Sequence, residues 1–170
     1  MNTLNDFANN LINTKYMSRR HTPKRNPLPP DPVYENQLVQ MIVNHLMKKG
    51  KKALAYRLCY QTMTKLEEIA QKDPVLVLEQ AVRNATPQVE VKGSRRGGSI
   101  RQIPRAVEGQ RGTALAIRWI LASCRSRSGR DTVSKLTSEL TDASKNMGNA
   151  VRKREETHRM AEANKVFAKR

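Results

Sequence analysis

Apolar residues recur along most of the chain at intervals of three and four, the spacing that places them on one face of an α-helix. In the first such segment they include Leu38, Ile42 and Leu46. Asp73 and Asp131 each stand just before an apolar-periodic segment, where a helix N-cap is expected. The pattern predicts six helices, over about residues 33–48, 52–71, 74–86, 112–126, 132–147 and 150–168.

One stretch between the third and fourth helices departs from the helical period. Val89 and Val91 alternate with polar residues before Gly97-Gly98, and a second, less regular alternation follows that pair. Two short runs of this kind around a Gly-Gly pair are typical of a β-hairpin, which we place at about residues 88–107. The predicted fold is mainly α: a six-helix bundle-like body with a protruding two-stranded β-hairpin.

The N-terminal part of the chain has a different composition from the rest. Residues 18–32 hold five of the eight prolines, which prevents a helix and favours an extended basic arm. Residues 1–17 are rich in Asn and fit neither a secretory signal nor an Arg-rich transit peptide. We expect a disordered N-terminal extension over 1–17 and a single domain over 18–170, in which the helical body occupies 33–170.

The charge is large and unevenly distributed. A total of 32 Lys and Arg against 15 Asp and Glu gives a formal net charge of +17. Residues 15–25 hold five bases and no acid, and residues 92–130 hold ten bases against Glu108 alone. Such a surface suits a polyanion, with nucleic acid the first choice and an anionic membrane surface the second. No run of apolar residues is long enough to span a bilayer.

The basic residues gather in three places that this fold would expose. They are the N-terminal arm, the hairpin tip and one face of the fourth helix, where arginines recur every seven residues without an acid. The alternative is a set of ordinary solvated surfaces, but those usually mix Glu with Arg. The cations concerned are Arg19, Arg20, Lys24 and Arg25 in the arm, Arg95 and Arg96 at the tip, and Arg111, Arg118 and Arg125 on the helix.

The residues that carry enzyme chemistry are scattered. His21, His45 and His158 have no Cys, Asp or Glu neighbours at metal-ligand spacing, so no metal or other cofactor is expected. Cys59 and Cys124 lie in apolar surroundings and are interpreted as buried thiols of a reducing compartment. Aromatic residues make up only 4% of the chain. Recognition through phosphates and shape, as in folded RNA, is therefore favoured over base stacking.

Several segments resemble the bacterial-type small-subunit ribosomal protein seven (uS-seven) family, in the family's order and over about residues 17–168. They are Ser18-Arg-Arg20, Asp31-Pro-Val-Tyr34, Gly50-Lys-Lys52, Thr86-Pro-Gln-Val-Glu-Val-Lys92 with Gly97-Gly-Ser99 and Gln102-Ile-Pro104, Ala114-Leu-Ala-Ile-Arg-Trp119, and Arg152-Lys-Arg-Glu-Glu-Thr-His-Arg-Met-Ala-Glu-Ala-Asn-Lys165.

The resemblance implies a non-enzymatic structural constituent of the small ribosomal subunit, without a membrane or small-molecule partner. It implies binding to the 3′ major (head) domain of small-subunit rRNA, nucleation of head assembly, and a hairpin near the exit-site tRNA and the mRNA path. Neighbouring small-subunit proteins nine and eleven are the implied protein partners. It adds to the RNA-binding candidates Lys51, Lys52, Lys92, Arg101, Arg105, Arg152, Lys153 and Arg154.

The chain also departs from the family pattern. Arg95 and Arg96 stand one place later than the family's arginines, and a shift of one residue on a strand exchanges its faces. Residues 1–16 have no counterpart in the family.

Two segments look most like the plastid and cyanobacterial branch of the family. They are Val82-Arg-Asn-Ala-Thr-Pro87 and Arg125-Ser-Arg-Ser-Gly-Arg130. We expect an organelle-encoded plastid (chloroplast) ribosomal protein, with a mitochondrial ribosome or the bacterial cytoplasm as alternatives. An architectural DNA-binding protein is the competing class, although the tip lacks the apolar wedge such proteins commonly insert.

Overall fold

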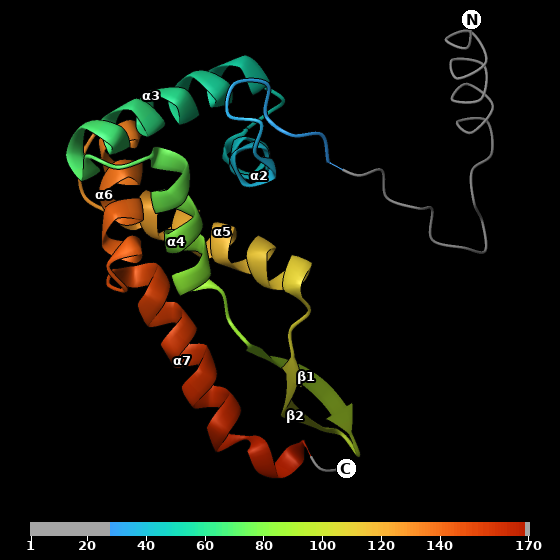
Figure 1. The fold of residues 1–170 in the computed structure, drawn as a ribbon. Helices are drawn as coiled ribbons and strands as arrows, with labels where there is room; N and C mark the ends of the chain where they lie inside the picture. Colours follow the sequence, from blue (N-terminus) through green and yellow to red (C-terminus); the bar gives the residue numbers. More distant parts are fainter. Residues whose placement is uncertain (1–27, 169–170) are drawn as a thin grey trace, which may run out of the picture.

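The computed structural model describes residues 28–168, and the prediction of a mainly helical fold with one hairpin is confirmed (Figure 1). The arm residues Arg19, Arg20, Lys24 and Arg25 and the extension 1–17 lie outside the described residues. The elements of the described part are α2 (Gln37–Leu46), α3 (Lys52–Ala70), α4 (Pro74–Ala85), β1 (Val89–Arg96), β2 (Ser99–Ala106), α5 (Gly109–Ser126), α6 (Thr132–Ser144), α7 (Asn149–Ala163) and the 3-10 turn η1 (Lys165–Phe167).

Two helices begin at the caps that the sequence indicated. The Asp73 carboxylate accepts a hydrogen bond from the Val75 N–H at 2.9 Å, and Pro74 occupies the first helical position of α4. The Asp131 carboxylate accepts from the N–H groups of Val133 and Ser134 at the start of α6. Two hydrogen bonds from Ser134 lower the pKa of Asp131 to about 2. The bond from the Ser134 hydroxyl has the larger effect, and the bond from its N–H the smaller.

The first described helix starts four residues later than predicted. Asp31 is 1% exposed, and its carboxylate accepts hydrogen bonds from the N–H groups of Val33 and Tyr34 at 3.1 Å. Those bonds hold residues 31–34 in a turn, and Glu35 takes a left-handed conformation with φ 49°. The predicted boundary at 33 was wrong because a buried carboxylate captures the N–H groups that would have started a helix.

The junction of the last two helices also differs from the prediction. α6 ends at Ser144 rather than 147, and Asn146 takes the left-handed conformation (φ 60°) just beyond it. Gly148, with φ 92°, is the N-cap of α7, and Asn149 is already helical. The acceptor at the start of α7 is a residue distant in sequence: Glu139 Oε1 accepts a hydrogen bond from the Ala150 N–H at 3.2 Å.

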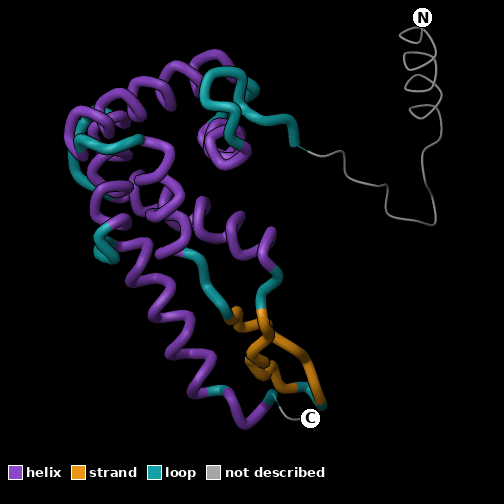
Figure 2. The backbone as a smooth tube through the Cα atoms, in the orientation of Figure 1, coloured by secondary structure: helices purple, strands orange, loops and turns teal. Residues whose placement is uncertain are grey.

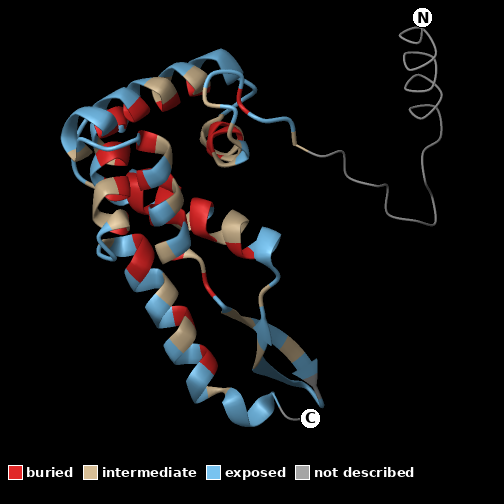
Figure 3. Cartoon of the chain, viewed as in Figure 1, coloured by how far each residue is buried: buried red, intermediate tan, exposed pale blue. Residues whose placement is uncertain are grey.

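The hydrophobic core lies where α3, α4, α5 and α6 pack together, with buried residues of α2 and α7 added to it (Figure 3). Large side chains from all four helices are at most 2% exposed, among them Leu66, Leu78, Ile117 and Leu136. Burial of each side chain of this size stabilises the fold by roughly 1.5–3 kcal/mol. Cys59 and Cys124 are buried free thiols, as expected, and burial raises the pKa of Cys59 to about 12.

The hairpin extends away from this body, and the chain's last helix runs beside it (Figure 2). Its two strands pair antiparallel from Val89↔Ala106 to Arg96↔Ser99. The two-residue turn between them is Gly97-Gly98, with φ 55° and 83°, the positive angles that a type I′ turn requires. η1 brings the end of the described chain back against β2. None of the helices within residues 28–168 is long and apolar enough to cross a membrane.

Candidate nucleic-acid interface

Most of the predicted RNA-binding cations within the described residues are exposed. They are Lys51, Lys52, Lys92, Arg95, Arg101, Arg105, Arg111, Arg118, Arg125, Arg152 and Lys153. Arg154 is half-buried, and Arg96 is described only by its place on β1. The exposed cations lie on the hairpin, on α5, at the start of α3 and on α7.

The register of the hairpin sorts its cations by face. Paired residues share a face and successive residues alternate. The pairs Lys92↔Ile103, Ser94↔Arg101 and Glu90↔Arg105 therefore place Lys92, Arg101 and Arg105 on one face. The pair Arg95↔Ile100 lies on the other.

Some residues on the cationic face of the hairpin contact other elements of the protein. Glu90 receives two charge-assisted hydrogen bonds from Arg111, at 2.9 Å from Nε to Oε1 and 2.8 Å from Nη2 to Oε2. The Arg101 guanidinium lies over the Phe167 ring of η1, 5.5 Å from its centroid. At the hairpin's base, the Gln88 N–H donates to His158 Nε2 at 3.1 Å. The hairpin is thus attached to α5, α7 and η1 as well as to its own connecting segments.

The predicted arginine stripe on α5 is therefore not uniform. The helix brings no acid to that face, as expected, but β1 brings Glu90 to Arg111, and this hydrogen-bonded pairing raises the pKa of the guanidinium. Arg118 and Arg125 are exposed and make no ion pair with another described residue. The charge available to a polyanion on α5 is concentrated on those two residues.

The end of α2 lies against the same stripe. Arg125 Nη2 donates to the His45 carbonyl oxygen at 3.5 Å. Burial and the positive charge of Arg118 lower the pKa of His45 below its ordinary value of 6.5. The imidazole is thus neutral at pH 7 and adds no positive charge of its own to this surface.

The basic start of α7 has two different functions. Arg152 and Lys153 are exposed, and Lys153 pairs with Glu156 at 3.0 Å. Arg154 instead donates to the main-chain oxygen of Asn84, at the end of α4. The Asn84 side chain continues this link by donating to the carbonyl oxygens of Ala143 and Ser144, both at 2.9 Å. Arg154 joins α7 to α4, a role that its sequence neighbours do not reveal.

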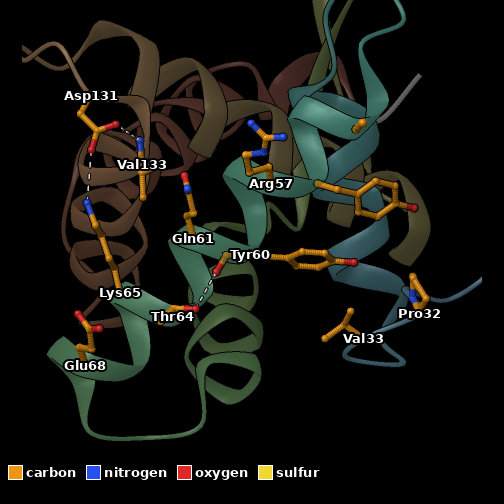
Figure 4. Close-up of a pocket in the computed structure, with 12 residues that line it drawn as sticks. Pro32, Val33, Arg57, Tyr60, Gln61, Thr64, Lys65, Glu68, Asp131 and Val133 are labelled. Atoms are coloured by element: carbon orange, nitrogen blue, oxygen red, sulfur yellow. Dashed lines mark hydrogen bonds and ion pairs between the residues drawn. The ribbon is translucent and has the colours of Figure 1, made fainter.

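A pocket of the described part lies along α3 and is completed by residues of the turn before α2 and of the start of α6 (Figure 4). The pocket measures about 1120 Å³ and is lined by Tyr56 and Tyr60 of α3 and by Val33. Side chains of both charges also line it, among them Lys65, whose Nζ lies 3.5 Å from an Asp131 carboxylate oxygen. The Tyr60 hydroxyl donates a hydrogen bond to the Asp31 carboxylate at 3.0 Å. Burial, and to a smaller extent this hydrogen bond, raise the pKa of Tyr60 to about 12. Both tyrosines are half-buried, and Tyr56 also packs against the hydrophobic core.

The described residues display basic side chains rather than a cluster of titratable groups. Among residues 28–168, no three His, Cys, Asp or Glu side chains are grouped as a metal site would need. The charged side chains described above either join elements or stand exposed on the hairpin, α3, α5 and α7. A helical body that displays basic faces and a basic hairpin is typical of proteins of nucleic-acid assemblies.

The chain belongs to the ribosomal protein S7p/S5e (uS7) family, whose model matches residues 17–165. It is 60% identical over 152 residues to the small ribosomal subunit protein uS7c of Nephroselmis olivacea, covering 89% of this chain and 97% of that protein. The Chlorella vulgaris uS7c is 58% identical, over 90% of this chain and 98% of that protein. The uS7 of Acaryochloris marina (strain MBIC 11017) is 54% identical, over 89% and 97%. The chain is thus a structural constituent of the ribosome that serves translation without catalysis.

Proposed function

We propose that this chain is part of the head of the small ribosomal subunit, where it binds the 3′ major domain of small-subunit rRNA and nucleates head assembly. The observation that carries the proposal is the exposed, acid-poor set of cations on the hairpin and on α5, above all Arg118 and Arg125. Cations in fixed positions on rigid elements bind phosphates along a folded RNA and fix its orientation on the protein.

The hairpin has a second role in this proposal. The proposal places its tip, with Arg95 and the Gly97-Gly98 turn, near the exit-site tRNA and the mRNA path. The hairpin extends away from the helical core, beside α7 (Figure 1). Small-subunit proteins nine and eleven are the neighbouring proteins. The supports are the projection of the hairpin, its bracing by α7 and η1, and the family to which the chain belongs.

The proposed compartment is the plastid ribosome, with the chain encoded in the organelle. The relatives named uS7c in Nephroselmis olivacea, Chlorella vulgaris and Ostreococcus tauri, at 57–60% identity, support it. Sucrose-gradient fractions of isolated plastids, probed for this chain, test the assignment. The chain is expected to sediment with small subunits and whole ribosomes, and its absence from both would refute the plastid assignment.

The RNA target is tested by comparing three ligands: a 3′ major domain rRNA fragment, a 5′ domain fragment of equal length, and duplex DNA. The 3′ major fragment should bind at least tenfold more tightly than either competitor. If the protein makes six to ten phosphate contacts, its affinity for the RNA should fall by a factor of about 10³–10⁵ as the salt concentration rises from 50 to 200 mM, on the scaling for duplex DNA. Equal affinity for all three ligands, or a preference for DNA, would refute the proposal.

The N-terminal arm is proposed to add phosphate contacts to this surface. Arg19, Arg20, Lys24 and Arg25 have no acid near them in the sequence that would neutralise them. Arg19→Ala with Arg20→Ala is therefore expected to weaken binding to the 3′ major fragment by about 1–3 kcal/mol, the scale of hydrogen bonds to charged groups. The melting temperature of the variant should equal that of the wild type. A clear fall would mean that the arm serves the fold rather than the RNA.

A further inference from the structure

We infer that a small apolar cavity beside the basic stripe is a slot for one unstacked nucleobase of the bound RNA. The cavity lies between the end of α2, the start of α3, the last turns of α5 and the start of α6. This inference rests on the proposed rRNA binding and specifies a further mode of contact, the insertion of a base beside the phosphate-binding cations.

Most of the residues that line the slot are apolar. The cavity measures about 200 Å³, several times the roughly 30 Å³ that one water molecule occupies in the liquid. Its apolar lining consists of Leu46, Met47, Leu54, Ala55, Leu58 and Leu121. Cys124 also lines it, and burial raises the pKa of that thiol, so the wall it forms is uncharged at neutral pH. A flat, largely apolar group has favourable surroundings here.

The rim of the slot carries only positive charge. Among the described residues, Lys48, Lys51 and Arg125 line it, and no acidic residue does. Arg125 Nη2 lies 3.5 Å from the His45 carbonyl oxygen, which places the guanidinium against the end of α2. The larger cavity of Figure 4 differs in this respect, because Glu68 and Asp131 accompany its cations.

This combination matches a nucleotide better than it matches a segment of protein. A nucleotide is an apolar-faced base joined to an anionic phosphate, and proteins hold extruded bases between apolar or aromatic side chains. The slot supplies the apolar walls, and the three rim cations lie where the flanking phosphates would be. An apolar side chain of another protein would fill the walls but leave those cations unpaired. Since Thr132 is the only uncharged hydroxyl or amide side chain in the lining, discrimination among bases should be weak.

Leu54 provides the test because it lines the slot yet is 48% exposed, so its truncation spares the core. Leu54→Ala should weaken binding to the 3′ major fragment about five- to tenfold, the scale for losing part of a leucine's apolar contact. The slope of log affinity against log salt should not change, because no phosphate contact is lost. Lys51→Ala should instead reduce that slope by about one. Leu76→Ala is the matched control, since Leu76 is 61% exposed on α4 and is not part of the lining.

Chemical probing of the RNA supplies the second measurement. Wild-type protein and Leu76→Ala should protect the base edge of one nucleotide that Leu54→Ala leaves reactive. Unchanged RNA affinity and protection with Leu54→Ala would overturn the slot, and weaker assembly with neighbouring ribosomal proteins in that variant would assign the cavity to a protein. If the wild type itself does not prefer the 3′ major fragment, the proposed rRNA target has failed. The two failures are therefore distinguishable.

Discussion

Arg127 donates a hydrogen bond of 2.6 Å to the carboxylate of Glu139, a side chain that is completely buried. Arg127 follows directly after α5, and Glu139 lies in the middle of α6. The other carboxylate oxygen accepts from the Ala150 N–H at 3.2 Å, and the same guanidinium also bonds to Asp142. One buried carboxylate thus joins the end of α5, the middle of α6 and the beginning of α7.

Removal of this carboxylate should destabilise the protein substantially. Glu139→Ala is expected to lower the free energy of unfolding by about 3 kcal/mol, the low end for a broken buried ion pair, because Arg127 keeps Asp142 as a partner. Urea titration followed by circular dichroism measures the change. Glu156→Ala is the control, since its pair with Lys153 is half exposed and should contribute less than about 1 kcal/mol. Equal effects of the two variants would contradict the role assigned to Glu139.

The two ends of the α5 stripe should respond differently to salt. Arg118→Ala is expected to reduce the slope of log affinity against log salt by about one for the 3′ major rRNA fragment, because one phosphate contact is lost. Arg111→Ala combined with Glu90→Ala removes a pair that is already neutral, so the slope should stay close to the wild-type value. Filter binding between 50 and 200 mM salt distinguishes the variants. A larger change for the double variant than for Arg118→Ala would show that Arg111 is the main phosphate contact.

The outer half of the hairpin should be dispensable for folding. Lys92 and Ile103 are paired, so residues 93–102 can be replaced by an Asn-Gly turn that connects them in register. The attachments of Glu90 to Arg111 and of Gln88 to His158 remain, so the helical circular dichroism signal and the cooperative melt should be preserved.

Two results would complete this test of the hairpin. Ribosomes that carry the shortened protein should show altered occupancy of the exit site by tRNA, since the proposed role of the tip is local. A non-cooperative melt would instead mean that the contact of Arg101 with Phe167 is needed to hold the last turn of the chain on the fold.

Stability should fall as the pH drops below neutral, in part because of His45. Burial, and secondarily Arg118, lower its pKa in the folded state below the ordinary 6.5. As the pH falls through 6.5 the unfolded chain binds the proton first, so the free energy of unfolding decreases. The urea midpoint of the wild type should therefore decrease between pH 7.5 and 5.5, and that of His45→Gln should decrease less. The same decrease in both proteins would show that other groups cause it.

Much of the helical pattern was predictable because it depends on near neighbours. Apolar spacing and the caps Asp73 and Asp131 located the helices to within a few residues, and Gly97-Gly98 located the hairpin turn. Each of these signals acts over one or two turns of chain, where side-chain chemistry and backbone geometry are directly coupled. The uneven distribution of charge was equally predictable, because exposed cations can be identified in the sequence without knowledge of any partner residue.

The sequence by itself determined the fold class, the order of the elements and the basic surfaces. Tertiary structure alone decided which charges are free and which join the fold. Arg111 meets Glu90 across 21 positions, and Arg154 reaches the main chain of Asn84 across 70. Glu139, in the middle of α6, accepts a hydrogen bond from the Ala150 N–H at the start of α7. Such contacts depend on how packed helices orient side chains that are distant in sequence, and no local periodicity specifies that orientation.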